Sequence, residues 1–237
     1  MRRTALRLVF VGALIGGVVY VALAMTATDP ALRTVALGQF PRALAADVTT
    51  GHVFVASDSA MYTNEVAMLD ASSGAVLNAP LVRGAPWALA VDSRHGHAFV
   101  ANAGAPSVSV IDTRTGALVR TVPLIGAPNA IAVDARTARV FVTGNNQAAF
   151  MGILDARTGT ALRQYPSHAG PHLLVADETL GRVFVTNDDY TIDTLNGAMG
   201  ARLRTAGLGG ARALSPWTSR GDASSSRQHW RWTFSTP

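Results

Sequence analysis

The chain has 237 residues, and 49% of them are hydrophobic, so it can bury the core of one or two domains. It contains no cysteine, which excludes disulfide bonds, thiolate metal sites and thiol nucleophiles. The net charge of +5 arises at the two ends, because residues 8–214 hold 14 arginines and 14 acidic residues. Since this central part is neutral, we expect no nucleic-acid partner.

Residues 8–25 form an uncharged apolar run that follows three arginines. We predict an apolar helix here, within an N-terminal segment of residues 1–28. As a helix, the 18 residues would span about 27 Å, slightly less than the ~30 Å hydrocarbon core of a bilayer. The arginines predict that the rest of the chain is exported, to the periplasm or outside the cell. Two interpretations stay open: Ala22-Leu23-Ala24 favours a cleaved signal peptide, whereas the length of the run favours a retained anchor in the inner membrane.

A motif that begins with proline recurs four times, at a spacing of 42 to 45 residues. Aspartate follows each proline by six residues, and an apolar triplet centred on phenylalanine comes after a short turn. The copies are residues 41–57, 86–102, 128–144 and 171–187. A fixed period of this length predicts a repeat architecture.

Each repeat is predicted to form four short strands. In the second repeat these strands are residues 88–91, 97–102, 107–111 and 117–124, separated by turns. Four strands in about 43 residues are typical of one blade of a β-propeller. We therefore predict an all-β fold in which residues 35–214 form about four blades, near residues 41–80, 86–124, 128–166 and 171–208.

The turn before the fourth strand also recurs, with Asp at its start and Gly four residues later. The predicted turns are residues 70–74, 112–116, 155–159 and 193–197. Aspartate can accept hydrogen bonds from backbone N–H groups of such a turn, and glycine supplies the positive φ. We therefore interpret these carboxylates as structural. On this count the fourth repeat is short, because the step from Asp155 to Asp193 is 38 residues.

Residues 54–57, 99–102, 141–144 and 184–187 all begin with Phe-Val. These segments resemble the Tyr-Val-Thr-Asn signature of the YVTN-type β-propeller repeat family, and the hairpin of residues 110–116 is also similar to that family. The resemblance covers about residues 35–214. It implies an exported propeller of seven blades; many members of the family have no assigned activity, and some relatives are lactonases or bind DNA.

The chain departs from this family pattern because it supplies about four blades. A fifth repeat begins at residues 211–214, which parallel residues 41–44, and then stops. Residues 215–237 are rich in Ser, Arg and Trp, so we predict a disordered tail that is truncated or out-of-frame coding sequence. An open arc of blades exposes a sheet face at each end, which predicts self-association.

Candidate ligand-binding residues lie at two positions of each repeat. The residue after the proline varies sharply; it is Arg42, Trp87, Asn129 or His172. The loops after the second strand lie on the same face of a propeller and contribute Asn102, Asn145, Asn187 and Asp188. Variable polar or aromatic side chains at one architectural position are typical of a ligand surface, and ordinary loop polarity is the alternative interpretation.

The histidines give little support for a metal site. His95 and His97 are close in sequence, but the position of His97 is taken by another histidine or by arginine in the other repeats, as expected of a polar turn. A second pair, before the fourth repeat, lacks a third ligand. Motifs of serine hydrolases, phosphate-binding loops and zinc proteases are absent. We predict no catalytic residue, metal or cofactor.

Three functions stay open. The first is an exported, non-catalytic binding scaffold for an unknown protein or small molecule, which also contacts the membrane if its N-terminal segment is uncleaved. The second is a lactonase-like hydrolase with a metal at the mouth of the channel. The third is a truncated gene product without an independent function.

Overall fold

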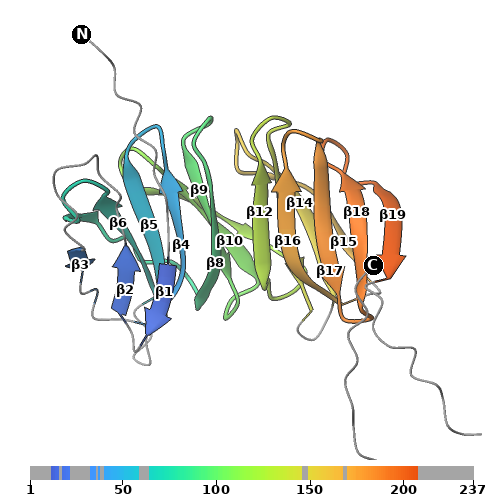
Figure 1. Ribbon diagram of the computed structural model, residues 1–237, viewed down its shortest axis with the longest axis horizontal. Helices are drawn as coiled ribbons and strands as arrows, with labels where there is room; N and C mark the ends of the chain where they lie inside the picture. The colour runs from blue at the N-terminus through green and yellow to red at the C-terminus, as the bar shows by residue number, and fades with distance from the viewer. Residues whose placement is uncertain are drawn as a thin grey trace, which may run out of the picture.

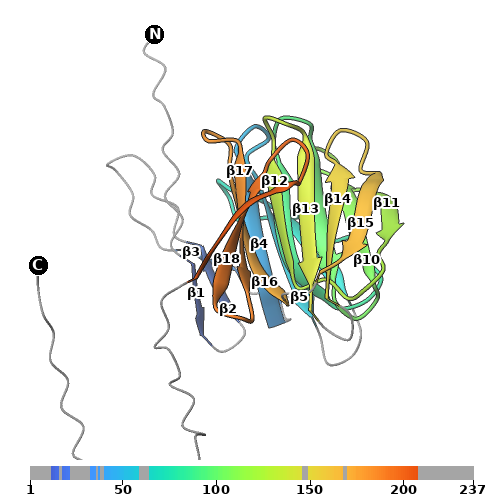
Figure 2. The same cartoon turned by 90° about the vertical axis from the view of Figure 1, so that its right-hand side faces the viewer.

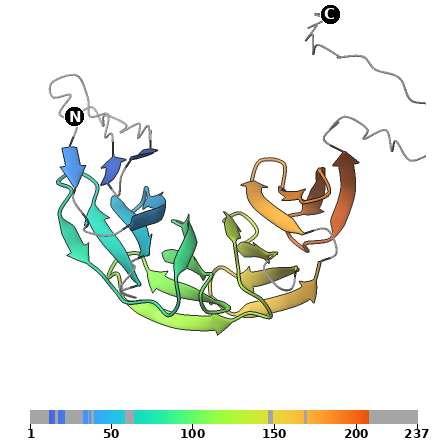
Figure 3. The same cartoon turned by 90° about the horizontal axis from the view of Figure 1, so that it is seen from below.

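The computed structural model describes residues 12–15, 18–21, 33–35, 37, 40–58, 64–145, 149–167 and 170–207. The regular elements in these residues are β-strands. Four antiparallel sheets of four strands follow one another along the chain, and Figure 3 shows them in an open arc, like the blades of an incomplete propeller. The prediction of an all-β fold built from four-stranded units is confirmed.

We number these sheets blade 1 to blade 4 in chain order. Blade 1 contains β4 (Phe40–Asp47), β5 (His52–Asp58), β6 (Glu65–Asp70) and β7 (Val76–Asn78). Blade 2 contains β8 (Pro86–Asp92), β9 (His97–Asn102), β10 (Ser107–Asp112) and β11 (Leu118–Pro123). Blade 3 contains β12 (Ala130–Asp134), β13 (Arg139–Gly144), β14 (Phe150–Asp155) and β15 (Ala161–Pro166). Blade 4 contains β16 (Pro171–Asp177), β17 (Arg182–Asn187), β18 (Thr191–Asn196) and β19 (Arg202–Gly207).

The core lies between blades, and the phenylalanine of each second strand packs toward the next blade. Phe54 lies in one apolar cluster with Ala98 and Val100 of blade 2. Phe99 and Phe141 lie in the corresponding clusters shared with blades 3 and 4, and all three phenylalanines are fully buried. Because a blade within the arc is covered on both faces, its second strand is apolar on both faces as well.

Alanine occupies the first strands where neighbouring blades come closest. Figure 1 and Figure 2 show these first strands running side by side, and β4, β8, β12 and β16 contact one another in that order. Ala88 and Ala90 of β8 pack against the apolar cluster shared with blade 3. Ala130 and Ala132 of β12 are buried at the junction with blade 4. Small side chains permit this close approach without overpacking.

The fourth of the predicted turns is wrong by three residues. In blade 4 the turn spans residues 196–200: the Gly200 N–H donates to the Asn196 carbonyl at 2.7 Å, and Gly200 has a φ of 68°. Asn196 Oδ1 accepts the N–H groups of Ala198 and Met199. Asp193 instead lies inside β18 and is buried. Asparagine accepts the same turn hydrogen bonds as aspartate, so blade 4 is not shortened.

The turn aspartates of the other blades have a depressed pKa. Partial burial raises the pKa of Asp155, but hydrogen bonds from the Thr158 and Arg157 N–H groups and the charge of Arg139 outweigh it, so this pKa lies below its usual value of 3.8. The pKa of Asp112 is lowered in the same way by its own turn. These carboxylates therefore stabilise their hairpins in the ionised form.

Three further strands lie beside blade 1: β1 (Gly12–Ile15), β2 (Val18–Val21) and β3 (Arg33–Val35) form an antiparallel sheet (Figure 1). The two described segments of the predicted helix over residues 8–25 are thus strands, in accord with their branched valine and isoleucine residues. In the part of the chain that is described, no helix is long and apolar enough to cross a membrane. The rest of residues 1–28, the start of a fifth repeat and the predicted tail of residues 215–237 lie outside the described residues.

Candidate functional site

The first strands give the arc two distinct ends. We call the end with Pro41, Pro86, Pro128 and Pro171 the proline end, and the opposite end, where these strands reach their aspartates, the aspartate end. All four prolines are buried. In blades 1, 2 and 4 the strand pairing shifts directly after the proline, which leaves Arg42, Trp87 and His172 as the extra residues of β-bulges. A bulge changes the direction of a side chain and interrupts pairing, and it is frequent beside functional sites.

Blades 1 and 2 place a cation and an aromatic ring together at the proline end. The guanidinium carbon of Arg42 lies 4.9 Å from the ring centroid of Trp87, within the range of a cation–π contact. Trp87 is 45% exposed, although tryptophan is a large apolar residue. The pair therefore offers a solvent-accessible indole surface beside a positive charge.

Blades 3 and 4 carry a chain of polar contacts at the same end. Asn129 Nδ2 donates to Asn145 Oδ1 at 3.0 Å, and Asn145 Nδ2 lies 3.3 Å from Nδ1 and 3.2 Å from Nε2 of His172. His172 Nε2 contacts Asp188 Oδ1. An ionised carboxylate only accepts hydrogen bonds, so the contact with Asp188 requires a proton on Nε2. The side chains of His172 and Asp188 are 52% and 54% exposed, so this chain of contacts is open to solvent.

The polar chain contains a histidine oriented by a carboxylate, which is one half of a general-base arrangement. The other half would be a hydroxyl or water on the free ring nitrogen. Here the amide of Asn145 lies beside both ring nitrogens of His172 instead. The arrangement is suited to hydrogen bonding with a ligand, and its described contacts include no nucleophile.

Two of the predicted site residues lie inside their own blades. Asn102 is fully buried, and its amide donates to the hydroxyls of Ser107 and Ser109, both at 3.0 Å. Asn187 is also buried, and its amide donates to Thr191 and Asp193. These contacts brace the hairpins between second and third strands, and their burial does not fit direct contact with a ligand. The six other predicted residues gather at the proline end in two groups.

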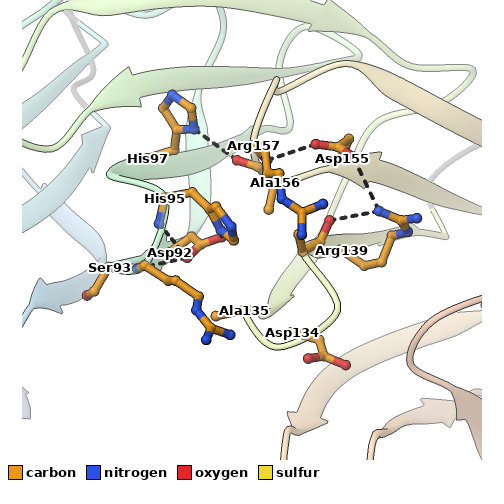
Figure 4. A network of polar contacts seen from close by, with 12 residues as sticks. Asp92, Ser93, His95, His97, Asp134, Ala135, Arg139, Asp155, Ala156 and Arg157 are labelled. Atoms are coloured by element: carbon orange, nitrogen blue, oxygen red, sulfur yellow. Dashed lines mark hydrogen bonds and ion pairs between the residues drawn. The ribbon is translucent and has the colours of Figure 1, made fainter.

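At the aspartate end, side chains connect each blade to the next. In each of the three junctions the acceptor is a backbone carbonyl. It belongs to the residue that follows the Asp or Asn of the turn before the fourth strand. The bonds run from His52 Nδ1 to Thr113 O (2.8 Å), from His97 Nδ1 to Ala156 O (2.9 Å) and from Thr137 Oγ1 to Gly197 O (3.1 Å). Figure 4 shows the ring of His97 directed at Ala156, and the adjacent Asp92–His95 pair held within one turn. His52 and His97 begin β5 and β9 and bond across blade junctions, whereas His95 lies in a turn and pairs with Asp92.

Two concave regions were not predicted. A groove of about 610 Å³ crosses the turns of blades 2 to 4 at the aspartate end, with Arg94, Arg136 and Glu178 in its lining. A pocket of about 390 Å³ lies between blades 3 and 4 and includes Tyr165, whose pKa is raised mainly by burial. The groove residues lie mainly in the first turn of the second, third and fourth motif copies, and the pocket residues lie mainly on the third and fourth strands of blades 3 and 4. Their side chains differ from repeat to repeat, so spacing alone gave no signal for either. No group of three His, Cys, Asp or Glu side chains that could hold a metal occurs among the described residues.

The chain matches no protein-family model and no curated protein in sequence. Among solved structures 1334 chains match it, so the architecture is widespread and does not by itself select a function. One match is the hydrazine synthase of Kuenenia stuttgartiensis, a protein that contains a β-propeller, with a TM-score of 0.61 and 20% sequence identity. The match covers 70% of this chain and 48% of that chain. The fold is propeller-like. At this identity the likeness says nothing about activity, and the chain spans less than half of that protein's length.

Proposed function

We propose that this protein is an exported β-propeller repeat protein, similar to the YVTN-type family, that acts as a non-catalytic binding scaffold. The uncharged run of residues 8–25 behind three arginines supports export. The Phe-Val segments support the family similarity, because each occupies the second strand of its blade. The ligand-binding surface is the proline end of the arc.

The observation that carries this proposal is the solvent-open polar chain from Asn129 through Asn145 and His172 to Asp188. Its members come from two different blades, and the buried prolines fix the start of each first strand beside them. A surface whose members flank the ends of strands and are held by mutual hydrogen bonds is preorganised, which lowers the entropic cost of binding.

The chemistry of this surface suits a ligand that bears hydroxyl groups. Asparagine amides, an imidazole and a carboxylate together offer both donors and acceptors, and a hydroxyl can meet either kind. Trp87, on blade 2, adds an exposed flat apolar surface. A carbohydrate combines hydroxyl groups with apolar C–H faces, so a sugar is the ligand class that we propose.

Thermal unfolding of the full chain in the presence of neutral and N-acetylated oligosaccharides tests this function. A ligand present at 100 times its Kd stabilises the folded state by about 2.7 kcal/mol, which corresponds to roughly 5–10 °C in Tm for a unit of this size. The shift should disappear in the His172→Ala variant. It should persist in Arg94→Ala, which alters an exposed side chain at the aspartate end.

Fluorescence gives a second measurement, because Trp87 is the only tryptophan in the blades. The other three tryptophans, Trp217, Trp230 and Trp232, can be replaced by phenylalanine. A sugar that shifts Tm should then change the emission of Trp87. Absence of both signals across the panel would contradict a sugar ligand, and lactone hydrolysis that His172→Ala abolishes would overturn the non-catalytic proposal.

A further inference from the structure

Blade 4 carries a sheet face whose counterparts in blades 1 to 3 are buried. We infer that this face docks against the same face of a second copy of the protein, giving a two-fold symmetric dimer. The blade 4 face consists of Leu173 and Val175 on β16, Phe184 and Thr186 on β17, and Ile192 and Thr194 on β18. The inference does not rest on the proposed ligand surface, although Leu173 directly follows His172 in β16.

Strand pairing shows that the blade 4 face repeats the chemistry of the buried faces. In blade 3 the row that faces blade 4 pairs Ala132 with Phe141 and Phe141 with Ile153. In blade 4 the corresponding row pairs Val175 with Phe184 and Phe184 with Thr194, so threonine stands where blade 3 has Ile153. Each row ends on the fourth strand with an arginine; these are Arg120, Arg163 and Arg204 in blades 2, 3 and 4. The face of blade 4 therefore has the composition of an interface between sheets.

Exposure separates the blade 4 face from its counterparts. Ala130 and Ala132 are 7% and 8% exposed at the junction of blades 3 and 4. Leu173 and Val175 occupy the same two repeat positions and are 66% and 62% exposed. Phe184 is half-buried, although the phenylalanines at its position in the other blades are fully buried. Leu173 and Val175 thus stand where blade 3 has alanine, and these larger apolar side chains face solvent.

The other end of the arc does not offer a matching open face. There the outward face of blade 1, with Val53, Val55 and Leu69 in its apolar cluster, is packed by Val35 and Leu37. A head-to-tail contact with a second copy would have to displace this segment. Contact between two blade 4 faces requires no displacement, and such self-complementary two-fold contacts are the commonest kind in homo-oligomers.

The size of the face predicts the strength of the dimer. Four strands spaced ~4.8 Å apart, each about six residues long at ~3.3 Å per residue, give a face of roughly 20 by 20 Å. Two such faces would bury roughly 800 Å² in total, which is the size of a weak, transient protein–protein contact. We therefore expect a reversible dimer whose population rises with protein concentration.

Cysteine cross-linking of the full chain tests the dimer directly, since the natural sequence has no cysteine. Val175→Cys treated with a short bismaleimide should give a covalent dimer. Leu162→Cys is the matched control: Leu162 is also an exposed apolar strand residue, 51% accessible, but it lies on the outer strand of blade 3. The control should give at least tenfold less dimer at the same concentration.

Sedimentation equilibrium adds a readout that requires no cross-link. Val175→Glu places a charge on an already exposed position, so the monomer should keep its circular dichroism spectrum while its dimer dissociation constant rises at least tenfold. Leu162→Glu should leave that constant unchanged. The proposal fails if Val175→Cys cross-links no more than the control. It also fails if a monofunctional maleimide cannot reach that cysteine in monomeric protein, because another segment then covers the face.

Discussion

Replacing Phe99 with alanine should destabilise the protein far more than the same change at Phe184. The two residues occupy the same position in β9 and β17, but Phe99 is fully buried between blades 2 and 3, whereas Phe184 is half-buried. Removing a fully buried phenylalanine side chain costs about 3–5 kcal/mol, from lost burial and from the cavity that remains. Phe184 has no following blade in the described chain, so its loss should cost about 1–2 kcal/mol.

Urea unfolding followed by far-ultraviolet circular dichroism measures this difference. The two variants should be compared with the natural sequence at a protein concentration low enough to keep the chain monomeric, since a dimer would add burial at Phe184. Phe99→Ala should remove a fifth or more of a stability of about 5–15 kcal/mol. Equal losses in both variants would refute the reasoning that the next blade supplies the burial.

Three further changes test the turns and junctions. Gly200 has a φ of 68°, and a Cβ added there would meet the Ile153 side chain, whereas Gly51 has a φ of 73° and open space around it. Gly200→Ala should therefore lower the free energy of unfolding by at least about 1 kcal/mol more than Gly51→Ala, as measured by thermal unfolding. His97→Ala removes a hydrogen bond between blades and should cost about 1 kcal/mol in urea unfolding, partly restored by His97→Gln. Because the pKa of Asp155 is depressed in the folded state, the unfolded chain binds more protons below about pH 4, and stability falls as acid is added. Asp155→Asn should therefore lessen the difference in urea midpoint between about pH 7 and pH 3.

The repeat period was enough to predict the blades because each blade needs the same apolar alternation and the same turn. The fourth turn was misplaced because Asn196 replaces the expected aspartate, while Asp193 happens to precede Gly197 by four residues. Counting from Gly200 would have corrected this. The physical requirement is a residue that accepts backbone N–H groups, and asparagine and aspartate meet it equally.

The candidate site was predictable in position but not in side-chain direction. Spacing placed His172 and Asp188 at the proline end of blade 4, but the contact of His172 with Asn145 depends on how blades 3 and 4 are oriented. Spacing placed Asn102 there too, yet its amide turns inward to the hydroxyls of β10, Ser107 and Ser109. The stacking of Arg42 on Trp87 joins two repeats, so it depends on the angle between blades, which no single repeat encodes.

Contacts between blades run from each blade to the one that follows it in the sequence, and this sets an order for folding during synthesis. In blades 1 to 3 the phenylalanine packs against the blade made next, and the aspartate-end donor bonds to that blade. At about 5–20 residues per second, a repeat of 42 to 45 residues takes roughly 2–9 s to synthesise. During that interval the newest blade presents an apolar sheet face to its surroundings. A nascent chain of this kind thus offers a chaperone a recurring binding site that advances one blade at a time.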